Sequence, residues 1–337
     1  MLESQQTGRC IREFRAQLAR LYEWFEYYSA LIRVGEGSTL PLRGQLLGYK
    51  ARRPLGVVLQ ITPFNHPLLI AVKKLAAALA AGNSVIVKPS EVAPLTVLEL
   101  GPMTQEAGIP DGVVQILPGA AETAKQLVES PYIRKIDFTG GTRVGTLLSE
   151  QAGKRLIPIT TELGGKAPLI VMEDCPVDLA VNEQAVRSST LWQEEVFGPV
   201  VCVVPFRDDA HAIELANDSR FGLGASVWTA DHARFHRMVP RIKAGIVWLN
   251  THHRNDPSSP WGAIAPTGNF SGSGTASLGA NPSGIGRENG LEALNAYSTV
   301  QSITINYADH ETMRSSEDWF GPADKGAASS QPPVRYG

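Results

Sequence analysis

Five short motifs between residues 62 and 199 contain the side chains best suited to bind a ligand or to catalyse a reaction. The first is T-P-F-N-H-P at 62–67, in which the amide of Asn65 can donate a hydrogen bond to a bound oxygen. Spacing alone favours the simpler interpretation that Asn65 caps the helix that follows. The second is V-I-V-K-P-S-E at 85–91, where Lys88 supplies a cation and Glu91 a carboxylate for ribose hydroxyls. Taken alone, these two residues would more simply form a solvated pair of opposite charges.

The other three motifs add a glycine turn, a second carboxylate and an aromatic ring. F-T-G-G-T-R-V-G at 138–145 puts a glycine turn before a helix, whose N-terminal amides attract a pyrophosphate, although such turns are common. T-E-L-G-G-K at 161–166 places Glu162 beside two glycines, where it could serve as a general base. E-E-V-F-G-P at 194–199 pairs Glu195 with Phe197, whose ring could flank a planar ligand. Each motif is a modest signal by itself.

The segments around these motifs alternate between short apolar runs and longer stretches with helical spacing. The pattern predicts strands over 56–62, 84–88, 113–117 and 133–138, and helices over 67–81, 95–107, 121–129 and 140–152. Such alternation, with almost continuously apolar strands, indicates a parallel sheet covered on both faces. Because ligands bind at the carboxyl ends of parallel strands, the motifs that follow strands are expected along one edge of the sheet.

Outside this region the sequence predicts further elements and two irregular segments. One apolar stripe over residues 10–33 predicts a single helix. Strands are expected over 199–206, 225–229 and 245–249, with helices over 209–217 and 231–242. Residues 262–284, rich in Gly, Ser, Ala and Thr, indicate a flexible loop, and the composition of 308–337 indicates a disordered tail.

Composition narrows the class of protein. The chain has 337 residues, of which 43% are hydrophobic, which favours two domains. A net charge of −2 gives no reason to expect nucleic acid or an anionic membrane as a partner. The longest apolar stretch, 68–81, contains Lys73 and Lys74 and is too short and too charged to cross a bilayer. With no apolar signal segment in residues 1–9, we expect a cytoplasmic protein.

Three cysteines, Cys10, Cys175 and Cys202, are too few and too far apart for a disulfide framework or a metal site. Cys202 lies in the apolar run 200–204 and is expected to be a buried structural thiol. Cys10, at the start of the first predicted helix, is also expected to be structural.

The order and spacing of the five motifs resemble the aldehyde dehydrogenase family over nearly all of residues 10–307. The resemblance implies that Asn65 donates to the substrate oxygen in an oxyanion hole and that Glu162 is the base that activates water. It implies NAD⁺ as the cofactor, with NADP⁺ possible because the preference depends on Glu91 alone. The positions that it assigns to the cofactor are Thr62, Pro63, Phe64, Lys88, Ser90, Glu91, Gly119, Phe138, Thr139, Gly140, Gly141, Val144, Glu195 and Phe197.

Within that set the resemblance distinguishes two ends of the cofactor. Lys88 and Glu91 match the residues that hold the adenosine ribose, whereas Glu195 and Phe197 match those around the nicotinamide. Two positions differ from the family pattern: phenylalanine replaces a common tryptophan at position 64, and Gly141 stands where many relatives have serine.

The fold that the resemblance implies is α/β and aldehyde dehydrogenase-like. Its cofactor domain, with a doubly wound, Rossmann-like parallel sheet, is expected over 10–38 and 54–164. An incomplete α/β catalytic domain is expected over 165–290, and a β oligomerisation arm over 39–53 and 291–307. From that arm we expect a homo-oligomer or association with a full-length relative. The substrate, if the chain is active, is a small aldehyde.

The resemblance fails at the family's nucleophilic cysteine. Residues 178–189 lead directly into 191–195, whereas in relatives a long segment that contains this cysteine separates the two places. The chain also begins later than relatives do, and 263–281 resembles an insertion. Unspliced or wrongly joined exons, or a decaying gene, would produce such a truncated chain. We therefore expect an aldehyde dehydrogenase-like oxidoreductase with little or no activity. The alternative is a pseudoenzyme subunit that binds NAD(P) or joins an oligomer without catalysis.

Overall fold

The computed structural model of the protein describes residues 1–175, 189–264 and 282–311. It divides into two compact units. The first comprises Met1–Gly35 and Arg53–Thr299, and the second comprises Glu36–Arg52 and Val300–Gly337. None of the helices within the described residues combines the length and the apolar character that crossing a membrane would need. The predicted loop and tail lie mostly outside the described residues.

The centre of the first unit is a six-stranded sheet in the order β11-β7-β6-β3-β4-β5. Its strands are β3 (Val57–Ile61), β4 (Ser84–Lys88), β5 (Val114–Ile116), β6 (Ile133–Thr139), β7 (Ile159–Glu162) and β11 (Gly284–Ile285). The first five pair in parallel, and β11 is antiparallel to β7. Val58, Leu59 and Val87 are fully buried, as expected for a sheet covered on both faces. The predicted parallel sheet is confirmed.

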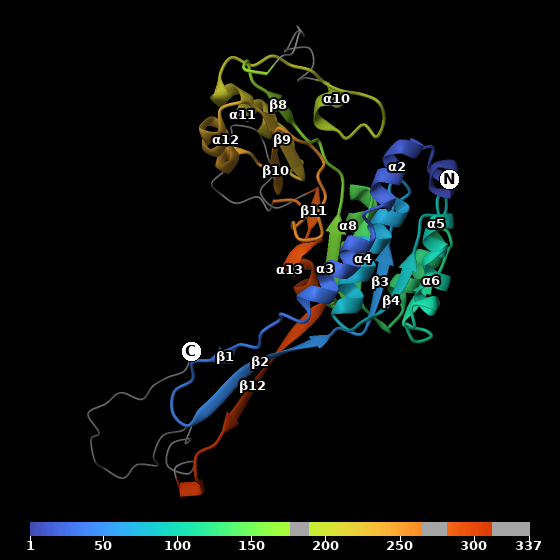
Figure 1. Ribbon diagram of the computed structural model, residues 1–337, viewed down its shortest axis with the longest axis vertical. Helices are drawn as coiled ribbons and strands as arrows, with labels where there is room; N and C mark the ends of the chain where they lie inside the picture. Colours follow the sequence, from blue (N-terminus) through green and yellow to red (C-terminus); the bar gives the residue numbers. More distant parts are fainter. Residues whose placement is uncertain (176–188, 265–281, 312–337) are drawn as a thin grey trace, which may run out of the picture. The chain divides into compact units, whose positions relative to one another are not determined.

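Helices cover this sheet on both sides (Figure 1). They are α3 (Tyr22–Leu31), α4 (Pro67–Ala80), α5 (Leu95–Leu98), α6 (Leu100–Glu106), α7 (Ala121–Glu129), α8 (Thr142–Arg155) and α13 (Gly290–Ala296). One core joins α3, α4 and α13 to β3 and β4, and includes Trp24, Tyr28 and Leu75. A second core packs α7 and α8 against β3 and β6 through residues such as Ile136 and Leu148. The sheet is therefore doubly wound.

Two predicted helices are each divided in the structure. Residues 10–33 form α2 (Ile11–Leu18) and α3, with a turn between them, after a short α1 (Leu2–Thr7). Helix α2 contacts α1, whereas α3 packs on α4, so the two parts of the apolar stripe are buried against different partners. The helix predicted over 95–107 is divided into α5 and α6 at Glu99.

A smaller sheet in the order β10-β9-β8 completes the first unit. Its parallel strands are β8 (Leu169–Val171), β9 (Gly224–Trp228) and β10 (Ile246–Leu249). The nearby helices are α10 (Thr190–Gln193), α11 (Asp209–Asn217), α12 (His232–Met238) and the 3-10 helix η1 (Val239–Arg241). Ala212, Ala225, Val227 and Met238 form its core.

The strand predicted over 199–206 is wrong. Residues 199–206 form no strand, and Val201 is 84% exposed. An apolar, β-branched run has strand propensity, but a strand also needs an adjacent strand with which its backbone amides and carbonyls can form hydrogen bonds. Among the described residues, no strand pairs with this segment, and the small sheet consists of β8, β9 and β10 alone.

The second unit contains a three-stranded sheet in the order β1-β2-β12. Strand β1 (Thr39–Leu40) runs antiparallel to β2 (Leu46–Pro54), and β12 (Ser298–Asn306) lies on the other side of β2. The sequence placed the start of the C-terminal part of this arm at residue 291. The structure places α13 in the first unit, against α4, and the second unit resumes at Val300.

Candidate active site

The carboxyl ends of β3, β4, β6 and β7 lie side by side, and the backbone joins the residues that follow them. The amide of Thr62 donates to the carbonyl of Lys88 at 3.1 Å, and the amide of Gly140 donates to the carbonyl of Glu162 at 3.0 Å. These two bonds place the first four motifs along one edge of the sheet. Parallel α/β sheets bind their ligands at such an edge.

Glu162 is a buried carboxyl group without a hydrogen-bond partner in the described part of the chain. The residue is only 4% exposed, and neither carboxylate oxygen accepts a bond there. Burial, followed by the nearby charge of Glu288, raises its pKa well above 4.5, although Lys73 and Lys74 act in the opposite direction. A Cβ at Gly262 would lie 2.8 Å from Oε1 of Glu162, so this oxygen packs closely against the glycine backbone.

Two lysines of α4 form a buried ionic network whose charges act on Glu162. Nζ of Lys73 lies 2.7 Å from one oxygen of Glu288, and Nζ of Lys74 lies 2.5 Å from the other. Lys74 also pairs with Asp137 on β6. Burial lowers the pKa of Lys74, but Asp137 and Glu288 together outweigh it and the pKa is raised. For Glu288 the attraction of both lysines outweighs burial and lowers the pKa.

Asn65 lies between β3 and α4 and does not cap the helix. The N-cap residue of α4 is His66, without a side-chain cap, and Oδ1 of Asn65 accepts instead from the amide of His66 at 3.0 Å. This bond leaves the side-chain NH₂ group as the available donor. The capping interpretation from the sequence is therefore not supported, and the amide group can face a ligand.

Lys88 and Glu91 lie at the end of β4. Nζ of Lys88 donates to Oε2 of Glu91 at 3.2 Å, so the ion pair expected from the simpler interpretation is present. The lysine side chain is buried, whereas that of Glu91 is 54% exposed. The pKa of Glu91 is lowered, first by a bond from its own amide and further by Lys88, against a rise caused by burial. An exposed, ionised carboxylate here can accept bonds from ribose hydroxyls. Pro63 and Ser90 lie near these strand ends and are half-buried.

The glycine turn after β6 leads into α8. Gly141 is the N-cap of this helix, no side chain caps it, and a Cβ at this position would have no atom within 4 Å. Val144, in the first turn, is 48% exposed, whereas Phe138 is buried in the sheet. Thr139 donates to Oε1 of Glu288 at 3.3 Å, which links the turn to the ionic network. Gly119 precedes α7 with φ +157, and a Cβ there would overlap Thr123.

The fifth motif also reaches this edge. The rings of Phe197 and Phe64 meet edge to face with centroids 5.7 Å apart, and both side chains are exposed. A Cβ on Gly164 would overlap Oε2 of Glu195, which places this carboxylate against the backbone after β7. All five motifs therefore meet in the first unit.

Comparison with known proteins identifies the family of this chain. The model of the aldehyde dehydrogenase family matches residues 1–189 and 183–303. The chain belongs to the aldehyde dehydrogenase family. Together the two matches cover most of the described residues, including every motif named above.

Several solved structures, among them two aldehyde dehydrogenases, have the same fold. Betaine aldehyde dehydrogenase from Staphylococcus aureus, in complex with NAD⁺, is 26% identical with a TM-score of 0.81, over 91% of this chain and 79% of the other. A putative aldehyde dehydrogenase from Burkholderia cenocepacia is 30% identical with a TM-score of 0.80, over 90% and 80%. PnpE from Pseudomonas sp. WBC-3 is 29% identical with a TM-score of 0.80, over 92% and 82%.

The three cysteines of this aldehyde dehydrogenase relative are free thiols. Cys10 is exposed at the N-cap of α2, and Cys175 is half-buried. The prediction that Cys202 is buried in a strand is wrong, because the residue is half-buried in a segment without a strand. Its Sγ donates to the carbonyl of Leu191 at 3.4 Å. In the described ranges, no hydrogen bond joins a thiol to Asn65 or Glu162, and no three potential ligand side chains are grouped to hold a metal ion.

Sequence reasoning missed the network of Lys73, Lys74, Asp137 and Glu288. A usable signal was present, since two adjacent lysines inside an apolar helix must find buried partners if the helix does not cross a membrane. The sequence interpretation used these lysines only to exclude a membrane span. The identity of their partners, on β6 and after β11, depends on the fold.

Proposed function

We propose that this protein is an aldehyde dehydrogenase-like oxidoreductase that binds NAD⁺ and a small aldehyde but has little or no turnover. The observation that carries the proposal is the contrast between Glu162 and the thiols. The carboxyl group is buried without a hydrogen-bond partner, with Asn65 on the same sheet edge, yet no thiol bonds to either residue in the described ranges. The site thus retains its acid–base and hydrogen-bonding groups without the nucleophile.

The strand ends suit a dinucleotide. Lys88 and Glu91 offer a cation and an ionised carboxylate for the adenosine ribose. The uncapped N-terminus of α8, with an open position at Gly141, suits a pyrophosphate. The related Staphylococcus aureus enzyme was solved with NAD⁺, which supports the same cofactor here. When bound, the nicotinamide supplies the hydride acceptor. NADP⁺ remains the alternative, since the preference depends on the Glu91 carboxylate.

Asn65 and Glu162 would have separate roles in the reaction. The amide group of Asn65 would donate to the aldehyde oxygen, where negative charge develops. Glu162 would accept a proton from the attacking water. Because its pKa is raised, the carboxyl group stays protonated to a higher pH than an ordinary glutamate does. Phe197 would pack against the nicotinamide beside Phe64. None of these groups forms the covalent bond with the aldehyde carbon that a thiolate forms.

The loss of a nucleophile is severe. Removing the nucleophile of a serine protease costs a factor on the order of 10⁶ in turnover. We therefore expect at most a residual aldehyde-dependent formation of NADH. The alternative, a pseudoenzyme subunit, is favoured by the same observation and by the separate unit that contains β1, β2 and β12. Such a subunit would bind nucleotide or join an oligomer, with itself or a full-length relative, without turnover.

The proposal includes a missing internal segment. The family model matches in two stretches that meet at residues 183–189, which supports a deletion between residues 181 and 195. Wrongly joined exons or a decaying gene would account for it, and sequencing the transcript across this point tests the idea. A transcript that encodes the chain as printed would count against wrongly joined exons. Three free thiols suit a reducing compartment, so we also propose a cytoplasmic location.

Two measurements on the purified chain test the proposal. Calorimetric titration with NAD⁺ is expected to show binding, and absorbance at 340 nm is expected to show little NADH after an aldehyde is added. Glu91→Gln should weaken nucleotide binding, whereas Lys125→Met, on the exposed surface of α7, should not. Absence of nucleotide binding would overturn the proposal, and turnover at the rate of a complete family member would overturn the predicted loss of activity.

A further inference from the structure

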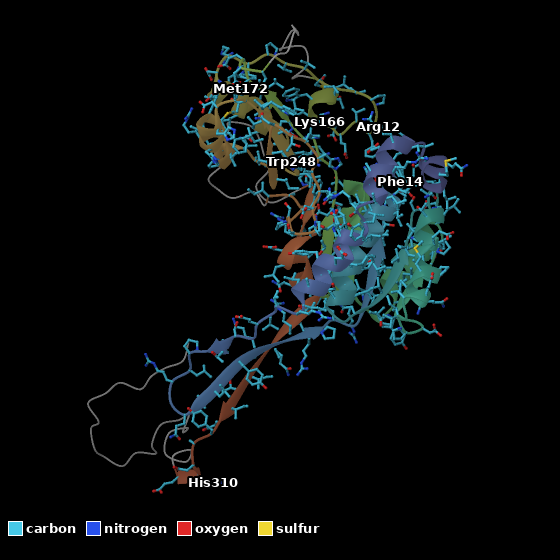
Figure 2. The ribbon with its side chains drawn as sticks, viewed as in Figure 1. Arg12, Phe14, Lys166, Met172, Trp248 and His310 are labelled. Carbon is cyan, nitrogen blue, oxygen red and sulfur yellow. The ribbon has the colours of Figure 1, made fainter. Side chains whose placement is uncertain are left out.

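Five aromatic side chains form a continuous group next to the candidate active site, which we call the histidine–tryptophan cluster: His66, Trp248, His252, His253 and Trp261. The rings of His66 and His253 are nearly perpendicular, with centroids 6.0 Å apart. Trp261 lies 5.5 Å from His253 and 5.8 Å from Trp248, whose side chain is labelled in Figure 2. Three of the five rings are imidazoles, so the cluster offers polar nitrogen atoms as well as apolar ring surface.

The cluster connects the two residues that we assign to chemistry. His66 follows Asn65 directly in the chain, and Trp261 precedes Gly262, whose Cα packs against Glu162. Nζ of Lys73 lies 5.0 Å from the centre of a Trp261 ring. A substrate whose carbonyl oxygen meets Asn65 and whose carbonyl carbon lies near Glu162 would extend its remaining atoms along this cluster.

Hydrogen bonds fix the tautomer of His66. Nη1 of Arg9 donates to Oε1 of Gln17 at 3.1 Å, which orients the amide of that side chain. Nε2 of Gln17 lies 3.2 Å from Nδ1 of His66 and can only donate, so Nδ1 accepts and the ring proton is on Nε2. In the described part of the chain no residue accepts from that Nε2–H group. It is therefore a donor available to a ligand.

His253 is held in an unusual conformation. Its φ is 52°, in the left-handed region that non-glycine residues rarely adopt, and such strain gathers at functional sites. Neither ring nitrogen has a hydrogen-bond partner among the residues described. The residue is accessible to solvent, yet enough protein surrounds its ring to lower its pKa.

Both imidazoles resist protonation while no ligand is bound. Burial lowers the pKa of His66 to about 4, and Arg9, His253 and Lys73 lower it further, while Glu13 opposes them. The pKa of His253 is lowered by burial, His252, Lys73 and Arg9, again against Glu13. A negative charge placed beside both rings would reverse the balance, because each ring could then bind a proton and donate to the anion.

We propose that the histidine–tryptophan cluster binds a carboxylate at the far end of the substrate, so that the aldehyde class taken by this site is an aldehyde acid. The inference rests on the proposed function, since it needs the aldehyde end to lie between Asn65 and Glu162. The carboxylate accepts a bond from Nε2 of His66 and a second from His253. The cations that act on these rings, Arg9 and Lys73, are already paired with Glu13 and Glu288, so the two imidazoles supply the recognition. An uncharged aldehyde would leave these donors without partners, which is costly when they are desolvated.

The test compares two aldehydes of similar size, 4-oxobutanoate and its uncharged methyl ester. Calorimetric titration of the full chain, with and without NAD⁺, is expected to show that the acid binds about tenfold or more tightly than the ester at pH 6. Binding takes up protons, so the affinity for the acid should fall as the pH rises toward 8, while that for the ester stays constant. In NMR titrations, 4-oxobutanoate should raise the pKa of His66.

Variants separate the cluster from the rest of the protein. His66→Gln and His253→Gln should each remove the preference for the acid and keep NAD⁺ binding, whereas His232→Gln, at an exposed position of α12, should change neither. Equal affinities for acid and ester, or a preference that survives both cluster variants, would overturn the inference. Because NAD⁺ binding is measured in the same samples, its absence would count against the proposed function separately.

Discussion

The ammonium group of Lys73 lies 2.7 Å from the carboxylate of Glu288, and both side chains are buried. The same carboxylate binds Lys74, which in turn binds Asp137. One acidic residue after β11 thus neutralises much of the positive charge that α4 carries into the core. The arrangement ties α4, β6 and the C-terminal segment of the first unit together, and its charges act on the pKa of Glu162.

Glu288→Gln is expected to destabilise the fold strongly. It leaves Lys73 and Lys74 with too little negative charge, and removing one partner of a buried pair costs about 3–5 kcal/mol. The free energy of unfolding in urea measures the change. Glu292→Gln is a matched control, because Glu292 lies exposed on α13 and should shift the free energy by less than about 0.5 kcal/mol. A similar, small effect of both substitutions would contradict the role of the network.

Glu162→Gln is expected to flatten the dependence of stability on pH above pH 4.5. The pKa of Glu162 is raised in the folded protein, first by burial and then by Glu288. Its contribution to stability is therefore complete below the unfolded value of 4.5 and is lost as the pH rises through the folded pKa. Unfolding free energies of both proteins from pH 5 to pH 9 should diverge, with the variant relatively more stable at high pH. Parallel curves would show that the carboxyl group is not perturbed.

Acid should destabilise the protein through Glu288. Its pKa is lowered in the folded state, because the attraction of Lys73 and Lys74 outweighs the effect of burial. This contribution is present above the unfolded value of 4.5 and is lost as the pH falls through the folded pKa. We expect the stability of the natural chain to fall below pH 4.5, as followed by circular dichroism. Glu288→Gln should lack that part of the fall, and an unchanged acid profile in the variant would argue against it.

Two glycines of the site should respond oppositely to a larger side chain. At Gly262, with φ +150, a Cβ would lie 2.7 Å from the carbonyl of Gly286 and 2.8 Å from Glu162, so Gly262→Ala should cost about 1–3 kcal/mol. Gly141 has room and ordinary backbone angles at the N-cap of α8, so Gly141→Ser should be neutral or stabilise by a few tenths of a kcal/mol. The melting temperatures of both variants measure these changes. Equal shifts of the melting temperature for the two variants would contradict this geometry.

The end of β4 should control nucleotide affinity. Lys88→Met removes a buried cation and Glu91→Gln removes an ionised acceptor, and a hydrogen bond to a charged group contributes about 1.5–3 kcal/mol. Each variant should therefore bind NAD⁺ about tenfold or more weakly, measured by calorimetry. Glu91→Gln should also reduce the discrimination against NADP⁺, whose phosphate a carboxylate repels. If NADP⁺ remains excluded in that variant, the cofactor preference does not depend on Glu91.

Much of the cofactor domain could be predicted from the sequence. The run 84–88 forms β4 and the stretch 121–129 forms α7, because their apolar residues follow the periods of a buried strand and of a helix. The run 199–206 shows the limit of this reasoning. Its residues favour a strand, but a strand forms only beside another one, and propensity does not say whether a neighbour exists.

By itself, the sequence determined the alternation of strands and helices, the order of the five motifs and the identity of the three thiols, because these depend on local spacing and on residue type. Only the tertiary structure decided that Lys74 meets a carboxylate 214 residues away, that Glu162 has no hydrogen-bond partner among the described residues, and that Asn65 leaves its helix uncapped. Each of these depends on which distant surfaces become buried together, and burial sets the strength of a charge and the need of a polar group for a partner.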